Sequence, residues 1–495
     1  MRVSLTRRPQ LSQARGMGYP RAVAAAASLA LTVALAACAS KAPAYAPPPL
    51  PVPDAYPVVT PPDGPAPDAA AGTPLPEWRT YFLDVRLQSL IELALAHNRD
   101  LRGAVLRVDE ARLAYRVRRA DRWPVVAASA NTSHARVPDI GITGRAMETE
   151  LIALGASANG WELDFWGRVR SLRDADLETY LATDAARRAV TLSVITQVAN
   201  GYLALGELDE RLALARRTLA IREDALRIFR RRVEVGATSK LELTQVEVLW
   251  QQATALVAQL ELARATEAHA LHALIGAAAD LAPVLGRLDE TAMFMEVQPG
   301  LPSDLLTRRP DIVAAEHALK AANANIGAAR AAFFPQISLT GIAGLASTAL
   351  GSLFSAGSVA WIFMPSLSQP IFEGGRRQAA LDLSEVRREQ AIVRYEQTIQ
   401  TAFRDVSDAL SARHWLQEQV RILGETLRVQ AERARLAALR YDSGAGRYLE
   451  VLDAERERLA VEQQLVQTRR ALLSSHVALY AVLGGGPLPV AEVTP

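Results

Sequence analysis

Apolar side chains recur every three and four residues along two long stretches that contain no proline, residues 168–235 and residues 376–443. A helix rises about 1.5 Å per residue, so each stretch predicts a helix about 100 Å long. Alanine is abundant at the recurring positions, which lets neighbouring helices approach closely. The pattern is therefore typical of a coiled coil and is longer than a globular core needs.

Each long stretch ends at a glycine, Gly236 or Gly444, and a shorter helical pattern follows over residues 241–275 or 449–483. Glycine commonly ends a helix and reverses the chain, so we predict two helical hairpins with these glycines at their tips. Another helix is expected before the first hairpin, over residues 87–122. The opening and returning helices together match the long helix in length, which predicts that they stack end to end beside it.

Four shorter segments lie between the helical patterns and mix small, polar and apolar residues in alternation. They have the length of tilted membrane-spanning strands, about 9 to 11 residues or slightly more. We predict two β-hairpins, over residues 125–164 and 336–372, built from strands over residues 125–136, 151–164, 336–347 and 359–372. Soluble hairpins fit the same pattern, so these segments alone do not place the chain in a membrane.

The second half of the chain repeats the first. Asp100-Leu101 corresponds to Asp311-Ile312 at a displacement of 211 positions, and Gly236-Ala237 to Gly444-Ala445 at a displacement of 208. We therefore divide the folded part into repeats over residues 77–286 and 287–486, with a tail over residues 487–495. The predicted fold class is mainly α with a small membrane β part.

The amino terminus reads as a lipoprotein signal peptide over residues 1–37, with a basic start and a run of Ala, Leu and Val too short for a comfortable membrane span. Leu35-Ala36-Ala37-Cys38 resembles the bacterial lipobox, in which the thiol receives diacylglycerol. Cys38 is the only cysteine, which excludes an internal disulfide. We predict lipidation at Cys38; the alternative is a buried structural cysteine. Ala39 and Ser40 carry no acidic inner-membrane retention signal, which favours the outer membrane.

Residues 38–76 are rich in proline and alanine and show no helical or strand period, which predicts an extended, lipid-anchored tether. A proline-rich ligand for a recognition module is the alternative. The formal net charge is +2, but the signal peptide holds five arginines and no acidic residue, so the remainder carries −3. This charge balance disfavours a nucleic-acid partner.

A four-stranded sheet would leave two unpaired edges in lipid, where each unsatisfied backbone group costs several kcal/mol. One chain cannot close a barrel, and two chains would supply eight strands, which leave little room inside. Three chains would supply twelve strands and a ring of twelve stacked helices. The pattern therefore predicts an oligomer, with a trimer favoured.

Four motifs stand at the expected boundaries between helices and strands. They are Gly160-Trp161-Glu162-Leu163-Asp164-Phe165-Trp166-Gly167-Arg168, Arg309-Pro310-Asp311-Ile312, Phe333-Phe334-Pro335-Gln336-Ile337 and Pro370-Ile371-Phe372-Glu373-Gly374-Gly375-Arg376. With these motifs the sequence resembles the TolC superfamily of outer-membrane factors, in its NodT/OprM-like lipoprotein branch, over about residues 76–486. The resemblance implies a homotrimer with a 12-stranded β-barrel in the outer membrane and a 12-helix α-barrel in the periplasm. It also implies a periplasmic adaptor (membrane fusion) protein and an inner-membrane transporter, expected to be of the RND type.

Polar residues gather around the two expected tips. Glu450 and Asp453 are three residues apart, which places both carboxylates on one helix face, and threefold symmetry would make them stacked rings. The resemblance implies that such residues form an ion-pair network closing the periplasmic entrance. The alternative is an ordinary solvated helix face. The candidate gate residues are Tyr441, Glu450, Asp453, Glu242 and Arg447, although Gly446 could occupy the family's tip-arginine position instead.

No nucleophile elbow, metal cluster or cofactor loop occurs in the sequence, so we expect neither an enzyme, nor a metal site, nor a cofactor. The predicted function is an efflux channel for drugs or other small solutes. One alternative is the outer-membrane duct of a type I protein secretion system. Another is a periplasmic coiled-coil scaffold, which would not need β-hairpins at matched repeat positions.

Overall fold

A computed structural model describes residues 41–53, 56, 75–137, 147–283, 293–297 and 309–487. The signal peptide, the predicted lipidation site Cys38 and almost all of the predicted tail lie outside the described residues. The chain divides into two compact units, each drawing on both sequence repeats. The first unit combines Met1–Tyr45, Ala114–Leu177 and Lys320–Arg388, and the second combines Ala46–Leu113, Glu178–Leu319 and Glu389–Pro495.

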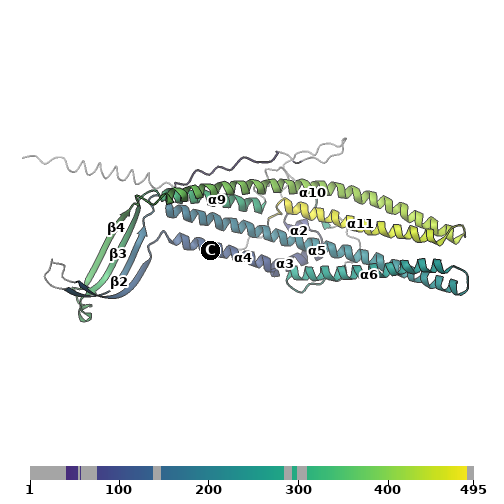
Figure 1. The fold of residues 1–495 in the computed structure, drawn as a ribbon, viewed down its shortest axis with the longest axis horizontal. Coiled ribbons are helices and arrows are strands. Elements are labelled where there is room, and N and C mark those ends of the chain that lie inside the picture. The colour runs from purple at the N-terminus through teal and green to yellow at the C-terminus, as the bar shows by residue number, and fades with distance from the viewer. Residues whose placement is uncertain are drawn as a thin grey trace, which may run out of the picture. The chain divides into compact units, whose positions relative to one another are not determined.

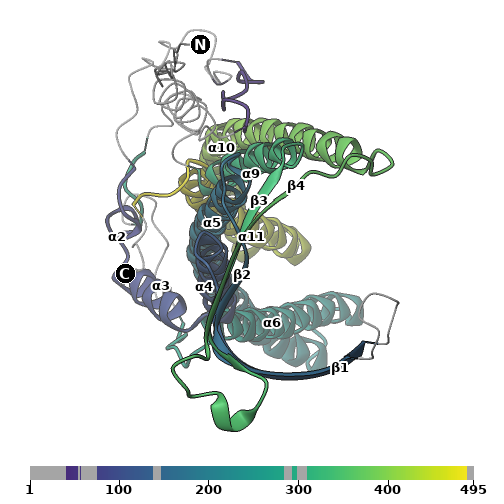
Figure 2. The ribbon, with the colours of Figure 1, turned by 90° about the vertical axis from the view of Figure 1, so that its left-hand side faces the viewer.

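The first unit contains one antiparallel sheet in the order β1-β2-β3-β4 (Figure 1). Its hairpins are joined by pairing of β2 with β3, with Leu154 opposite Leu345. β1 curves along one edge of the sheet (Figure 2), and among the described residues β1 and β4 each pair on one side only. The strands are β1 (Val126–Val137), β2 (Met147–Glu162), β3 (Gln336–Ser347) and β4 (Val359–Ser368).

The four predicted strands are confirmed, but two of their bounds were wrong. β2 begins at Met147, four residues before the predicted start, because its pairing with β1 extends to Val137. β4 ends at Ser368, four residues before the predicted end. The hairpins thus lie where the alternating pattern placed them.

The two faces of the sheet differ in polarity because successive side chains point to opposite sides. On β4, Val359, Trp361 and Phe363 share one face, and each is more than 60% exposed. The paired positions on β3 for these residues are also apolar or small. The opposite face includes Ser338, directly opposite Ser366. An apolar face backed by a mostly small and polar face suits strands between lipid and water.

Two helical hairpins dominate the second unit and begin in the first. They are α5 (Arg168–Glu234) with α6 (Lys240–Ile275), and α10 (Arg376–Asp442) with α11 (Tyr448–Val482). The long helices agree with the predicted ones to within one residue. α5 contains an 18-residue window apolar enough for a membrane span, but 61% of that window is buried in the protein.

The opening helix of the first repeat, predicted as one element, is broken in two: α3 (Val85–His97) and α4 (Arg99–Ala120). Asn98 separates them with an extended backbone. Its Oδ1 accepts a hydrogen bond from the Leu101 amide at 2.8 Å, and its Nδ2 donates to the carbonyl of Leu274 at 2.7 Å. These side-chain hydrogen bonds cap the start of α4 and hold the end of α6, so they favour a break at Asn98 over one continuous helix.

The same side chain joins the start of α4 to the end of α6. In the second repeat α9 (Pro310–Ala331) follows Arg309, whose Nη1 donates to the carbonyl of Val482 at the end of α11, at 3.3 Å. The Asp311 and Asp405 carboxylates beside Arg309 raise its pKa, although burial opposes them. The short helices of each repeat therefore meet end to end, as predicted.

Candidate functional site at the helix tips

Both predicted tip turns lie in the second unit. Gly236 and Gly444 have positive φ angles of 74° and 77°, a conformation that a side chain would strain. Each glycine allows the chain to reverse into the returning helix. The two turns fix where the helices that carry the candidate gate residues begin and end.

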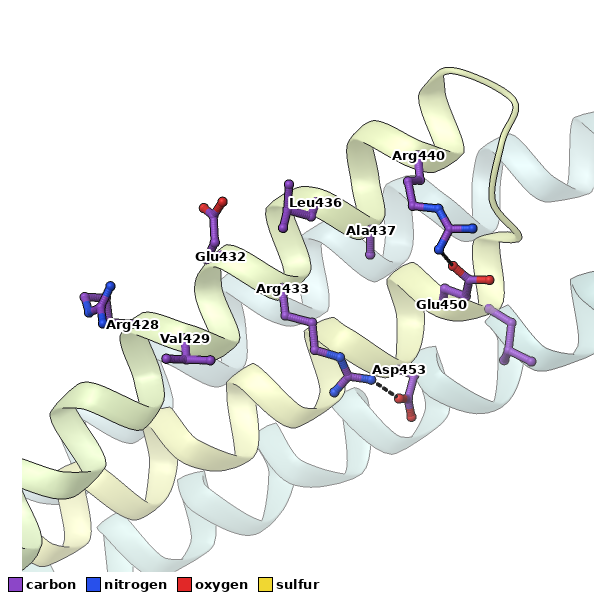
Figure 3. Close-up of a pocket in the computed structure, with 10 residues that line it drawn as sticks. Arg428, Val429, Glu432, Arg433, Leu436, Ala437, Arg440, Glu450 and Asp453 are labelled. Carbon is purple, nitrogen blue, oxygen red and sulfur yellow. Dashed lines mark hydrogen bonds and ion pairs between the residues drawn. The ribbon is translucent and has the colours of Figure 1, made fainter.

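The second hairpin holds both of its candidate carboxylates in ion pairs (Figure 3). The Arg440 guanidinium lies 3.2 Å from Oε2 of Glu450. The Arg433 guanidinium lies 2.7 Å from Oδ2 of Asp453, and that of Arg456 lies 2.8 Å from its Oδ1. Each carboxylate on α11 is therefore compensated by arginine, and the Arg433 and Arg440 pairs tie α11 to α10.

Tyr441 at the end of α10 connects the second hairpin to the first. Its hydroxyl accepts a hydrogen bond from Nη1 of Arg232 on α5. Its ring lies 4.9 Å from that of Tyr448, which in turn lies 4.6 Å from the ring of Phe229. This chain of contacts runs across the tips from α10 through α11 to α5.

Beneath the tips, an apolar cluster joins the first hairpin to α11. Its buried members are Leu226, Phe229, Val246 and Leu452, and Tyr448 packs against them. Burial raises the pKa of the Tyr448 hydroxyl. Three of the four buried members belong to the first hairpin, so this hairpin contributes most of the apolar contact.

A buried arginine lies beside this cluster. Arg222 donates to the carbonyl of Leu249 at 2.6 Å, which links α5 to α6 within the first hairpin. Burial lowers the pKa of the Arg222 guanidinium. The hydrogen bond therefore joins the two helices beside the apolar cluster, although burial of the guanidinium charge opposes it.

The other two candidate residues do not join this network. Glu242 lies in the first turn of α6, where its carboxylate accepts a hydrogen bond from the Thr238 hydroxyl. Arg447 occupies the N-cap position of α11 and makes no side-chain cap hydrogen bond. Within the described ranges the structure shows no ion pair between Arg447 and either Glu450 or Asp453. The expected arginine partner is instead Arg440.

Sequence reasoning missed the arginines that bind the gate residues: Arg232, Arg433, Arg440 and Arg456. A signal for two of them exists, because residues at roughly equal distances from a hairpin turn face each other across antiparallel helices. That rule places Arg440 near Glu450 and Arg433 near Asp453 around Gly444. Arg232 has no such signal, since it lies in the other repeat.

A groove of about 790 Å³ runs between α10 and α11 near their tip. The ion-paired residues line it together with the partly exposed apolar side chains Val429, Leu436 and Leu449 (Figure 3). No three His, Cys, Asp or Glu side chains lie close enough to hold a metal ion in the part of the chain that the structure describes. The groove is therefore lined by arginines of α10 that face carboxylates of α11.

Comparison with known proteins agrees with this architecture. The antibiotic efflux pump outer membrane protein ArpC of Pseudomonas putida is 42% identical over 86% of this chain and 89% of its own. The cation efflux system protein CusC of Escherichia coli K12 is 40% identical over 83% and 88%. The open-state crystal structure of the MtrE outer membrane channel of Neisseria gonorrhoeae superposes with a TM-score of 0.79 at 36% identity, covering 90% of this chain and 98% of that one.

A family model described as outer membrane efflux protein matches residues 90–277 and 301–485, one match in each repeat. The two matches cover most of the chain and include both helical hairpins and both β-hairpins. By sequence and by fold, the chain belongs to the outer membrane efflux protein family.

Proposed function

We propose that three copies of this chain form a passive duct through the outer membrane, through which a tripartite efflux system releases small solutes from the periplasm. The observation that carries the proposal is the sheet, which has one apolar face and one mostly small and polar face. Its outer strands β1 and β4 each pair on one side only among the described residues. Open edges are costly in lipid, and three sheets of four strands would close a barrel wide enough to conduct.

Exposed apolar side chains on the helices support assembly with further copies. On α10, Trp415, Ile422, Val429 and Leu436 recur every seventh residue, and each is 47–57% exposed. A heptad of apolar residues on a helix surface is the pattern that packs against another helix. On α6, the exposed apolar residues Leu241 and Val248 are seven residues apart, and Leu262 follows fourteen residues later.

The tips of the second hairpin act as the gate in this proposal. Threefold symmetry brings three copies of Glu450 and Asp453 around one axis, each held by arginines of its own chain. Opening separates the hairpins and breaks the bond between Arg232 and Tyr441. Arg447 is free of ion pairs to the gate carboxylates of its own chain, and we assign it to a carboxylate of the neighbouring copy.

The assembly has three further parts. Cys38 carries the lipid that anchors the tether in the outer membrane. A periplasmic adaptor contacts the helix tips, and an inner-membrane transporter, of the RND type, supplies energy. The duct itself performs no catalysis. Relatives of similar identity are named for antibiotic and for cation efflux, which fits a duct whose cargo is chosen by its transporter.

Reconstitution in planar bilayers tests the channel. Trimers confirmed by native mass spectrometry should produce discrete conductance steps, and divalent cations should block them from the periplasmic side by bridging the carboxylate rings. Trimers that insert but conduct no ions, even after Glu450 and Asp453 are both replaced by alanine, would refute the proposal. The alternative, a protein secretion duct, would be favoured if an exporter ATPase and not a proton-driven transporter copurified.

Mass spectrometry of the mature amino terminus tests the lipid anchor. It should show an acylated Cys38, and an unmodified terminus beginning elsewhere would contradict the assignment. Cys38→Ala with a cleavable signal should weaken membrane anchoring more than trimer assembly, because barrel contacts exceed what acyl chains add.

A further inference from the structure

The first described residues of the tether lie along α9 in the first unit. The Asn323 Nδ2 donates to the carbonyl of Pro43 at 2.8 Å. The Lys41 ammonium lies 5.4 Å from the centre of the Phe334 ring, and the Lys320 ammonium lies 5.2 Å from that of Tyr45. The tether supplies the cation in one of these cation–π contacts and the aromatic ring in the other, and the hydrogen bond lies between them. This order of contacts fixes the direction in which the segment runs.

Gly327 provides the space for this segment. A Cβ atom at Gly327 would lie 2.7 Å from the Ala42 nitrogen and 2.7 Å from Oγ of Ser171 on α5. Such distances are too short for any side chain, so the backbone of the tether occupies the place of a side chain. Glycine inside a helix is unfavourable relative to alanine, and the close approach of three segments explains its presence there.

The first repeat lacks this arrangement. The positions that correspond to Asn323 and Gly327 at the displacement of 211 are Arg112 and Arg116 on α4. Long arginine side chains there leave no notch for a backbone to enter. Among the residues that the structure describes, this arrangement therefore occurs on the second repeat alone.

We propose that Lys320, Asn323, Gly327 and Phe334 form a peptide-binding seat whose occupant is the tether segment 41–45 of the same chain. The seat holds Lys41 beside Phe334, two residues before β3 begins at Gln336. Lys41 follows Cys38 by three positions, and three residues of extended chain span at most about 10 Å. Resting on the proposed lipidation, the seat therefore fixes the point where the acyl chains enter the membrane, within about 10 Å of Lys41.

Trypsin cleavage tests the seat on the full-length protein in detergent. Lys41 is the only lysine or arginine between Cys38 and Arg79, so release of the amino-terminal peptide reports on Lys41 alone. Cleavage should be at least about tenfold slower than in a synthetic peptide of residues 38–53, because three contacts must open together. Equal rates in the protein and the peptide would overturn the proposal.

Variants on each side of the contact separate docking from misfolding. Asn323→Ala should accelerate cleavage about fivefold, and Tyr45→Ala, which lies on the tether and leaves the helices intact, about two- to fivefold. Arg112→Ala at the matching position of α4 is the control and should leave the rate unchanged. Unchanged rates in both Asn323→Ala and Tyr45→Ala would refute the seat.

The notch itself is tested by Gly327→Ala combined with Ser171→Gly, which removes the clash with α5 and leaves only the clash with Ala42. This double variant should release the tether to a greater extent than Ser171→Gly alone. The mass of the released peptide shows whether it carries acyl chains. Slow cleavage at Lys41 together with an unacylated peptide would contradict the lipid anchor but support the seat. The two proposals can therefore fail separately.

Discussion

The two helical hairpins descend from one repeated sequence but are held together by different forces at their tips. In the first hairpin, Leu226 and Phe229 are buried in an apolar cluster. The corresponding residues of the second hairpin, displaced by 208 positions, are Ala434 and Ala437. The second hairpin therefore lacks the large apolar side chains that fill the space between helices in the first.

Ion pairs between the helices show the reverse pattern: the second hairpin has two near its tip, Arg433 with Asp453 and Arg440 with Glu450, and the first has one, Arg230 with Glu247. The second hairpin carries Arg433 and Asp453 as an ion pair between helices, and the first has Ala225 and Gln245 at the same positions. Burial of large apolar side chains contributes several kcal/mol and is insensitive to salt, whereas exposed ion pairs contribute about 0–1 kcal/mol each and are screened. We therefore expect the second hairpin to separate more readily than the first.

One pair of residues is shared and still behaves differently. Arg232 and Glu242 in the first hairpin correspond to Arg440 and Glu450 in the second. Only the second pair forms an ion pair, because Arg232 turns to Tyr441 and Glu242 to the hydroxyl of Thr238. Local packing, and not residue type alone, decides which carboxylate forms an ion pair across its own hairpin.

Removing the largest apolar side chain of the cluster should abolish the greater stability that we expect for the tip of the first hairpin. Phe229→Ala should lower the free energy of opening of the α5–α6 tip by about 3–5 kcal/mol, through lost burial and the cavity left behind. Hydrogen exchange of the α5–α6 tip measures this change. Arg227→Ala, at an exposed ion pair, is the control and should shift exchange by less than about 1 kcal/mol. Equal effects of the two variants would contradict the difference between the hairpins.

Removing both gate carboxylates should loosen the second hairpin and change its selectivity. Glu450→Ala with Asp453→Ala removes two arginine pairs between the helices and one within α11. It should raise the open probability up to about thirtyfold, at up to about 1 kcal/mol for each pair between the helices. Cation preference and multivalent block in planar bilayers should fall while trimers persist. Glu242→Ala with Gln245→Ala in the first hairpin is the matched control. If both double variants kept wild-type selectivity and block, the carboxylates would be solvated surface.

Removing the hydrogen bond between Arg232 and Tyr441, which joins the two hairpins, should have a smaller effect on the open probability. Tyr441→Phe removes only the hydroxyl that accepts from Arg232 and should raise the open probability about fivefold, the equivalent of about 1 kcal/mol. Tyr441→Ala, which also removes the ring contact with Tyr448, should raise conductance further. Single-channel recordings measure both variants, and a Tyr441→Phe channel that opens no more often than wild type would exclude this bond from the gate.

Alkaline pH should weaken the apolar cluster slightly. Burial raises the pKa of Tyr448, so the folded state favours the neutral phenol. This stability is fully present below the unfolded pKa of about 10 and is lost as pH rises through the folded value. Hydrogen exchange at the tips should therefore accelerate above about pH 10, and Tyr448→Phe should remove that part of the acceleration. An identical pH profile in the variant would contradict this role.

The sequence predicted the long helices and the strands because their periodicities persist over many residues. It missed the break at Asn98, since the helical pattern continues across this residue and only the end of α6 reveals its partner. The arginines that hold Glu450 and Asp453 depend on how two helices align across a turn. The docking of residues 41–45 on α9 was missed because an extended proline-rich segment carries no pattern that identifies what it contacts.

Hydrogen exchange of both tips in the intact channel, at about 0.1 M and about 1 M salt, tests the difference between the hairpins most directly. Salt at these concentrations shortens the screening length from about 10 Å to about 3 Å. The α10–α11 tip around Gly444 should exchange faster than the α5–α6 tip around Gly236, and high salt should widen the difference. Equal exchange at the two tips, or a first tip that responds to salt as strongly as the second, would contradict the account.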